Sequence, residues 1–257
     1  MERNTLNLTK VKPYLLLTIC IVFFAGTALH AQFPDKFYNL KVLPKHISKE
    51  KLHQIMDNFT SGLGVNCGFC HAKDQSAPGD KLDFTKDTKP AKKKARVMMK
   101  MVEEINGDYM QKIADLSEDH DAEHVQCVTC HHGQKVPRTL EQVLTYTIDK
   151  DGVDAAVKKY HELYDKYYGG FQFDFKDHSL TRLTEDLIKA NKADAALAMS
   201  KLNSEMYPKS GVAFYGLAMA YEAKGDKQQA LENYKKVLEQ FPNNRRIMGK
   251  IQELQKQ

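Results

Sequence analysis

Apolar side chains recur at helical spacing in several stretches of this chain, and they predict a mostly helical protein. The first stretch begins after Ser48, whose hydroxyl can accept a free backbone N–H of the first helical turn. Its apolar positions lie three or four residues apart, at Leu52, Ile55, Met56, Phe59 and Leu63. Gly62 and Gly64 then tolerate the left-handed backbone that ends many helices. We therefore expect an amphipathic helix that ends just before Cys67.

A second amphipathic helix is expected from Pro90, which suits a first helical turn, to Gly107. Its apolar face consists of Val97, Met98, Met101, Val102 and Ile105. A shorter helical stretch follows at about 109–116, and an acidic segment leads from it to Cys127. The residues at about 72–88 are polar without a sustained apolar period, so we expect a connecting loop there.

Helical spacing returns at 139–147 and 152–168, whereas residues 171–175 alternate as in a short extended segment. In about the last 80 residues, matching positions lie 34 apart: Ala196 and Ala230, Leu197 and Leu231, Tyr207 and Phe241, Pro208 and Pro242. This period resembles the tetratricopeptide repeat. The clearer copy runs from Gly211 to Asn243, and the first copy has Arg182 where the later one has Gly216. Because two repeats are few for a solenoid, we expect them to pack on the helix at 152–168 or on the preceding domain.

The composition is that of an ordinary globular protein, with 42% hydrophobic and 28% charged residues among 257. The net charge is +5, and removal of residues 1–31 would take away three basic residues and one acidic residue, leaving +3. Four cationic side chains crowd the start of the second helix: Lys92, Lys93, Lys94 and Arg96. They form either a solvated face or a site for acidic groups. The modest overall charge gives no support for nucleic-acid binding.

The N-terminus has the three parts of a secretory signal peptide at residues 1–31. Basic residues precede an almost uncharged apolar run from Tyr14 to Leu29, and the small residue Ala31 marks a cleavage point before Gln32. Cys20 would leave with this segment. The alternative is an uncleaved anchor that associates the protein with the membrane, since a run of this length is only slightly short of a span. We favour cleavage and export to the periplasm.

The four remaining cysteines form two identical patterns, Cys67-x-x-Cys70-His71 and Cys127-x-x-Cys130-His131. A C-x-x-C-H pentapeptide is typical of covalent haem c attachment. The two thiols can add to the two vinyl groups of the porphyrin, and the adjacent imidazole then faces the iron. The sequence thus predicts two covalently bound haem c groups. Two structural disulfides or zinc sites are the alternatives, but neither explains a histidine after each pair.

The ligand on the opposite face of each iron is less clear from spacing. Met56 lies 11 residues before Cys67 on the apolar face of the first helix, and Met98 and Met101 lie on the second helix. A buried methionine is more often core packing than a ligand. The competing imidazoles are His53 for the first haem and His120, His124 or His132 for the second.

Residues from about 43 to 137 resemble the cytochrome c subunit family of photosynthetic reaction centres, in a short two-haem form. The matching segments are Met56 with Leu63-Gly64-Val65 before the first motif, Ala95-Arg96-x-Met98 with Val102 and Ile105-Asn106, and Val128-Thr129-Cys130-His131-x-Gly133. The resemblance implies that Met56 and Met98 are the sixth ligands and that Met101 packs. The family subunit has four haems in two similar halves, whereas this chain has one half and adds the repeats.

We therefore predict an all-α protein with a dihaem cytochrome c domain of helix-plus-C-x-x-C-H units and a tetratricopeptide-like module. The expected boundaries are residues 1–31 for the signal peptide, 32–140 for the cytochrome domain, 141–177 for a connecting helical segment and 178–257 for the repeats. Its expected function is electron transfer between redox partner proteins, with a further protein partner or a purely structural role for the repeats. The alternatives are a dihaem enzyme of peroxidase type with one open iron, and a non-haem zinc or disulfide protein.

Overall fold

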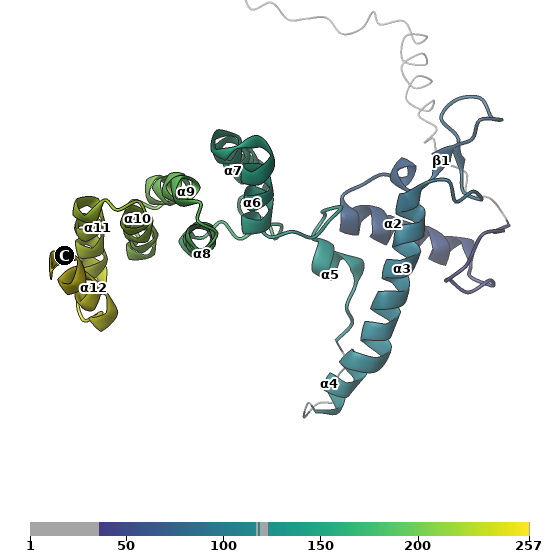
Figure 1. Ribbon diagram of the computed structural model, residues 1–257. Coiled ribbons are helices and arrows are strands. Elements are labelled where there is room, and N and C mark those ends of the chain that lie inside the picture. Colours follow the sequence, from purple (N-terminus) through teal and green to yellow (C-terminus); the bar gives the residue numbers. More distant parts are fainter. Residues whose placement is uncertain (1–35, 117, 119–122, 257) are drawn as a thin grey trace, which may run out of the picture. The chain divides into compact units, whose positions relative to one another are not determined.

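The computed structural model describes residues 36–116, 118 and 123–256, which are mostly helical, and the predicted all-α class is confirmed (Figure 1). The expected signal peptide, with Cys20, lies outside the described residues. These residues form two compact units, one of 36–54 and 68–99 and the other of 55–67 and 100–256. Among the described residues, no helix has the length and apolar character needed to cross a membrane.

Helix α2 spans Lys49–Leu63 and confirms the first predicted helix. The hydroxyl of Ser48 accepts the backbone N–H of Lys51 at 3.1 Å, so the predicted cap is present. Leu52 is the most deeply buried side chain of its apolar face, at 5% exposure. Gly64 adopts a φ of 62°, the left-handed conformation that ends the helix.

The segment after the first motif contains a small antiparallel hairpin that the sequence did not predict. Strand β1 (Ala72–Lys73) pairs with β2 (Leu82–Asp83), and the backbone N–H of Asp74 donates to Lys81 O at 2.8 Å. Two-residue strands are too short to show an alternating pattern, which is why the expectation of a simple loop was incomplete.

Helix α3 (Pro90–Glu104) continues without a break into the π-helical turn η2 (Ile105–Met110) and then into α4 (Gln111–Asp115). The predicted end at Gly107 was therefore wrong. A Cβ on Gly107 would meet no atom within 4 Å, and this glycine does not adopt a positive φ, so it does not act as a helix stop. The widened turn accommodates a glycine and an asparagine that would weaken an ordinary α-helix.

A half-buried carboxylate organises the unit formed by residues 36–54 and 68–99. The Asp87 side chain accepts bonds from Asn39 Nδ2 at 2.8 Å, Lys41 Nζ at 2.7 Å and Arg96 Nη1 at 2.7 Å, and it lies 3.3 Å from Lys92 Nζ. Lys92 also donates to two backbone carbonyls, both at 2.8 Å, and is only 8% exposed. These cations hold the pKa of Asp87 well below its usual range.

Within the other unit, the end of α2 contacts the second C-x-x-C-H motif, which forms the short helix α5 (Cys127–His131). The backbone N–H of Gly133 donates to Gly62 O at 2.9 Å. A Cβ on Gly62 would lie 3.2 Å from the Val128 nitrogen, and a Cβ on Gly64 would lie 2.1 Å from Gly133 O. Only glycine at both positions allows this approach of the two backbones.

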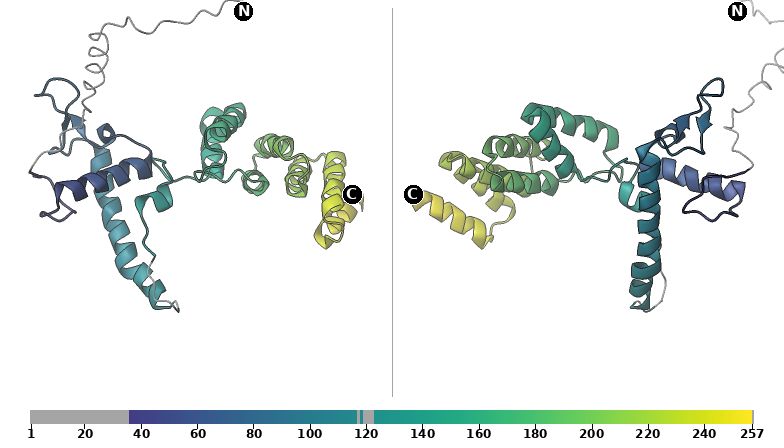
Figure 2. Two further views of the ribbon diagram at one scale, coloured as in Figure 1. Left: turned by 180° about the vertical axis from the view of Figure 1, so that it is seen from behind. Right: turned by 45° about the vertical axis from the view of Figure 1, so that its right-hand side comes forward.

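Antiparallel helices follow one another in the C-terminal part (Figures 1 and 2). Helix α6 begins after a capping box in which Thr139 Oγ1 and Gln142 N–H bond at 3.3 Å. The bounds are α6 Leu140–Asp151, α7 Val153–Tyr167, α8 Asp177–Lys189, α9 Ala193–Met206, α10 Gly211–Ala223, α11 Lys227–Gln240 and α12 Arg245–Lys256.

Two hydrophobic cores join these helices. The first combines side chains of α6 to α9 with Phe173 and Phe175, and the second combines α10 to α12. The expectation that the repeats pack on the helix at 152–168 is thus confirmed for α8 and α9. The alternating residues 171–175 form no strand, but Phe173 and Phe175 are both buried in the first core.

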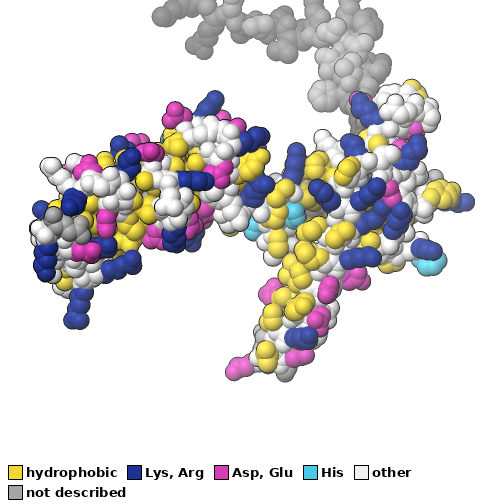
Figure 3. All heavy atoms as spheres, viewed as in Figure 1, with side chains coloured by type: hydrophobic (Ala, Val, Ile, Leu, Met, Phe, Trp, Pro, Cys, Tyr) yellow, Lys and Arg dark blue, Asp and Glu magenta, His cyan; other side chains and the backbone are white. Residues whose placement is uncertain are grey.

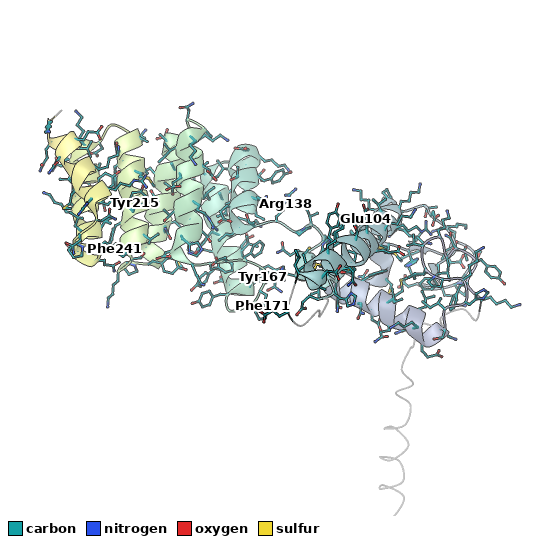
Figure 4. The ribbon with its side chains drawn as sticks, turned by 90° about the horizontal axis from the view of Figure 1, so that it is seen from below. Glu104, Arg138, Tyr167, Phe171, Tyr215 and Phe241 are labelled. Carbon is teal, nitrogen blue, oxygen red and sulfur yellow. The ribbon has the colours of Figure 1, made fainter. Side chains whose placement is uncertain are left out.

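The repeat positions serve the close crossing of helices. Ala196 and Ala230, 34 residues apart, are both fully buried. A Cβ on Gly216 would lie 3.3 Å from Thr181 Oγ1, so this position needs a small residue. Arg182, its counterpart in the first copy, instead reaches Glu141 Oε1 of α6 at 2.7 Å. Tyr215 and Phe241 mark α10 and the end of α11 in Figure 4.

The ion-pair cluster generates a prediction for acid stability. Because the folded state lowers the pKa of Asp87, the cluster stabilises the protein above the unfolded pKa of about 4, and this stabilisation is lost as the pH falls below it. Asp87→Asn should cost about 2 kcal/mol at pH 6, since it leaves the buried Lys92 less well paired. At pH 3 the difference in free energy of unfolding between Asp87→Asn and the unsubstituted chain should be smaller by about 1 kcal/mol, as measured by urea unfolding.

The control for that prediction is Asp80→Asn. Asp80 pairs with Lys73 on the surface, where its side chain is 86% exposed, so its loss should leave stability unchanged at both pH values. Equal effects of the two variants would contradict a special role for Asp87.

The glycine contact generates a second prediction. Gly64→Ala places a methyl group against Gly133 O in addition to forcing alanine into a left-handed conformation, and should destabilise the protein by about 3 kcal/mol. Gly79→Ala has the same conformational penalty, with φ at 78°, but opens onto free space and should cost about 1 kcal/mol. Thermal and denaturant unfolding of both variants would measure the difference. Similar losses would show that the backbone contact is unimportant.

Candidate functional site

The first C-x-x-C-H motif begins immediately after the turn at Gly64. Residues Cys67–Phe69 form a single 3-10 turn, η1, which displays Cys67 on the surface and leaves Cys70 half-buried. Within the described part of the chain, neither of them forms a disulfide. They can therefore take part in thioether bonds without prior reduction of a disulfide.

His71 completes this motif and lies in an apolar and cationic environment. Its ring packs edge-on against Phe84 with the centroids 4.8 Å apart. Burial, and then the positive charges of Lys92, Arg96 and Lys89, lower the pKa of His71 to about 4. The imidazole is thus neutral at physiological pH, which is the form that coordinates iron. Among the described residues, its buried Nδ1 atom has no hydrogen-bond partner.

The cationic run on α3 separates into two groups. Lys93 and Lys94 are exposed, as expected of a solvated face, whereas Lys92 is buried and Arg96 is half-buried. Lys89, just before the helix, donates to the carbonyl of Gly68 within the first motif. Of the two alternatives, a solvated face does not apply to Lys92 and Arg96, because Asp87 and backbone carbonyls bind them.

The second motif is helical throughout. The backbone N–H of Gln126 donates to Thr129 Oγ1 at 3.0 Å at the start of α5, and His132 ends the helix in a left-handed conformation with φ at 47°. Burial raises the pKa of the Cys127 thiol, whereas Cys130 is exposed. As in the first pair, neither thiol forms a disulfide with a described residue.

His131 is held by a hydrogen bond that fixes its orientation. The ring is 8% exposed, and its Nδ1 lies 2.8 Å from Gln134 O. A carbonyl can only accept, so Nδ1 must bear the proton, and Nε2 is left as the free coordinating atom. Gln134 in turn donates from Nε2 to Gln172 O at 3.0 Å. Such an outer hydrogen bond is the usual support of a metal-bound imidazole.

The candidate sixth ligands differ in exposure. Met56 on α2 and Met98 on α3 are both half-buried, whereas Met101 is 40% exposed. Among the competing imidazoles, His53, His124 and His132 are exposed, and His120 lies outside the described residues. The choice of Met56 and Met98 stays a prediction.

Apolar side chains line the arm formed by the end of α3, η2 and α4 (Figure 3). The exposed fractions are 40% for Met101, 55% for Tyr109, 54% for Ile113 and 88% for Leu116. Because Asn106 on this arm bonds to Val125, two residues before Cys127, the arm is connected to the second motif. An exposed apolar surface on the element that binds the start of the second motif suits a flat hydrophobic group such as a porphyrin.

The donor set therefore fits covalent haem. Each motif offers two thiols that form no disulfide with a described residue, and one neutral or hydrogen-bonded imidazole. No three His, Cys, Asp or Glu side chains within the described ranges come together to hold a metal ion by themselves, so the zinc alternative gains no support there.

Sequence reasoning missed three residues that support these motifs. Gln134 has no motif that announces it, and Lys89 was not separated from the other lysines. Asn106 did have a signal, because asparagine in the middle of a helix is locally unfavourable and commonly bonds to backbone elsewhere.

Two family models match the chain. Residues 32–146 match the photosynthetic reaction centre cytochrome C subunit, and residues 211–244 match the tetratricopeptide repeat. Cytochrome c-554 of Chloroflexus aurantiacus is 30% identical over 118 residues, covering 46% of this chain and 25% of that protein. The photosynthetic reaction center cytochrome c subunit of Rubrivivax gelatinosus is 26% identical over 123 residues, covering 43% of this chain and 32% of that protein.

This chain thus spans a quarter to a third of the length of these curated relatives. The matched regions contain both C-x-x-C-H motifs and the clearer repeat copy, and they confirm the two resemblances seen in the sequence. Residues 32–146 therefore resemble the photosynthetic reaction centre cytochrome c subunit family, and residues 211–244 resemble a tetratricopeptide repeat.

Proposed function

We propose that this protein is an exported dihaem c-type cytochrome that passes electrons between redox partners. The observation that supports it most is the pair of C-x-x-C-H motifs whose flanking segments are in direct backbone contact, Gly133 N–H to Gly62 O at 2.9 Å. Two haem groups held by one chain could exchange electrons with each other. The similarity to c-type cytochromes supports the electron-transfer role.

In this proposal each motif holds one haem c, which supplies reversible one-electron chemistry at its iron. Cys67 and Cys70 form the two thioether bonds at the first site, and Cys127 and Cys130 form those at the second. The imidazoles of His71 and His131 are the axial ligands. His71 is neutral, so no proton has to leave before it coordinates, and the bond from His131 Nδ1 to Gln134 O directs coordination to Nε2.

Met56 and Met98 complete the coordination from helices α2 and α3. Thioether ligation raises a reduction potential relative to a second histidine. With both axial positions filled, neither iron offers a place for a substrate, and the protein acts as a carrier rather than as an enzyme. The hydrogen bond from His131 to Gln134, and the cations beside His71, tune the two sites differently.

The helical repeats extend the role to protein contacts. We propose that the cytochrome domain spans residues 32–140, that 141–177 connects it to the repeats, and that the repeats at 178–257 bind a partner protein. The proposed location is the periplasm, with residues 1–31 as the export signal or as a membrane anchor. The donor and acceptor are redox proteins whose identity the sequence does not give.

The first test is a reduced-minus-oxidised absorption spectrum with intact mass, on protein exported by a host that attaches haem. We expect low-spin c-type bands, a mass increase of two haems and no spectral change with carbon monoxide, because all axial positions are filled. A haem-free protein would disprove the proposal. Carbon monoxide binding by the unsubstituted protein would instead favour a dihaem enzyme of peroxidase type.

The second test concerns the sixth ligands. Met56→Ala and Met98→Ala should each open one iron, so that one of the two haems binds carbon monoxide and its midpoint potential falls. Met101→Ala on the same helix face is the control and should leave both haems unchanged. A response of Met101→Ala in place of Met98→Ala would reassign the second ligand.

A further inference from the structure

The side chain of Asn106 binds the chain just ahead of the second motif. Its Nδ2 donates to Val125 O at 2.9 Å, and its Oδ1 accepts the Val125 backbone N–H at 2.8 Å. The half-buried Asn106 side chain thereby binds both the backbone N–H and the backbone C=O of Val125. A neighbouring β-strand would pair with a residue in the same way. Val125 lies two residues before Cys127.

The bond pair originates in an unusual part of the helix. Asn106 lies in the π-helical turn η2. This turn begins directly after Glu104, the last residue of α3, which is labelled in Figure 4. Asparagine and glycine at 106 and 107 each cost about 0.5–1 kcal/mol relative to alanine in an ordinary helix. π-helical turns are rare and often occur at functional positions. The local sequence is thus unfavourable for a helix but provides the one amide that holds Val125.

The hydrogen bonds to Val125 fix the chain immediately before the second C-x-x-C-H motif. The next residue, Gln126, donates its backbone N–H to Thr129 Oγ1 at 3.0 Å inside α5. From there the helix leads to His131, whose ring is fixed by Gln134. Asn106 therefore supports one end of the motif and Gln134 the other.

We propose that Asn106 is a positioning residue for the second haem. It acts through Val125 and fixes the start of the Cys127–His131 motif against η2. Without it, His131 is no longer held in a constant position, and the iron at this motif would lose its sixth ligand in part of the molecules. This inference rests on the proposed function, since it assumes a haem at each motif.

The experiment uses the full chain, exported and loaded with haem, in four forms. Asn106→Ala removes both bonds, and Asn106→Asp keeps the size of the side chain and one bond but replaces the donor by an acceptor. Gly107→Ala is the matched control, because it changes the same turn, meets no atom within 4 Å and leaves Asn106 in place. The unsubstituted chain is the reference. The readouts are intact mass, carbon monoxide binding and a redox titration resolved into two components.

We expect Asn106→Ala to shift one midpoint and to make one of the two haems bind carbon monoxide, while the other haem stays unchanged. Asn106→Asp should shift the same midpoint, and Gly107→Ala should behave like the unsubstituted chain. The unshifted haem shows that the variant is folded. A general loss of stability would affect both haems, so a change confined to one haem would exclude it.

Two results would overturn the inference. In the first, both Asn106 variants keep two midpoints and remain unreactive to carbon monoxide. In the second, both Asn106 variants shift the two midpoint potentials equally, and Gly107→Ala shifts them as well. That result would mean that any loosening of the π-helical turn affects both haems. Failure of the proposed function is recognised separately, because the unsubstituted chain would then lack haem or bind carbon monoxide itself.

Discussion

The close approach of two backbones at Gly62, Gly64 and Gly133 is the contact on which the packing of the end of α2 against α5 depends. A side chain at Gly64 would overlap the carbonyl of Gly133, and one at Gly62 would press on the backbone of α5. The same turn ends α2 and starts the first C-x-x-C-H segment. The same steric constraint therefore determines where the turn after α2 lies and that α5 and Gly133 pack against it.

The histidines of the two motifs lie in different surroundings. His131 is oriented by a hydrogen bond to a backbone carbonyl, whereas His71 is kept neutral by burial and by nearby cations and has an unpaired buried nitrogen among the described residues. An outer hydrogen bond increases the basicity of a ligating imidazole. Two otherwise identical motifs thus have different electrostatic surroundings, and the proposed relay would contain two distinguishable sites.

The C-terminal helices show how a short repeat becomes stable. A single helical hairpin cannot bury its apolar face, and two matching copies leave one end uncovered. Here α6 and α7 share a core with α8 and α9, although neither has the 34-residue match. Arg182 differs from the glycine of the later copy because α6 lies next to the first copy, and the Arg182 guanidinium binds Glu141 of that helix. The equivalent residue of the later copy, Gly216, lies against Thr181 instead.

Local sequence was sufficient for much of this protein. The apolar period predicts α2, the start of α3, α6 and α7, because burying one face of a helix requires that spacing. The serine before α2 and the threonine before α6 act as caps for equally local reasons. The two pentapeptides indicate haem attachment because the thiols and the imidazole must be neighbours in the chain to reach one porphyrin.

Only the tertiary structure decided which polar residues support those motifs. Lys92 looks like its exposed neighbours in the sequence, but in the fold it is buried and pairs with Asp87, whose partners come from two separate segments. Asn106 looks like a helix end until it meets Val125, 19 residues away. Helix formation depends on neighbours three or four residues apart, which a sequence displays. Pairing of a buried charge or amide depends on partners brought together by the fold, and the sequence alone does not reveal them.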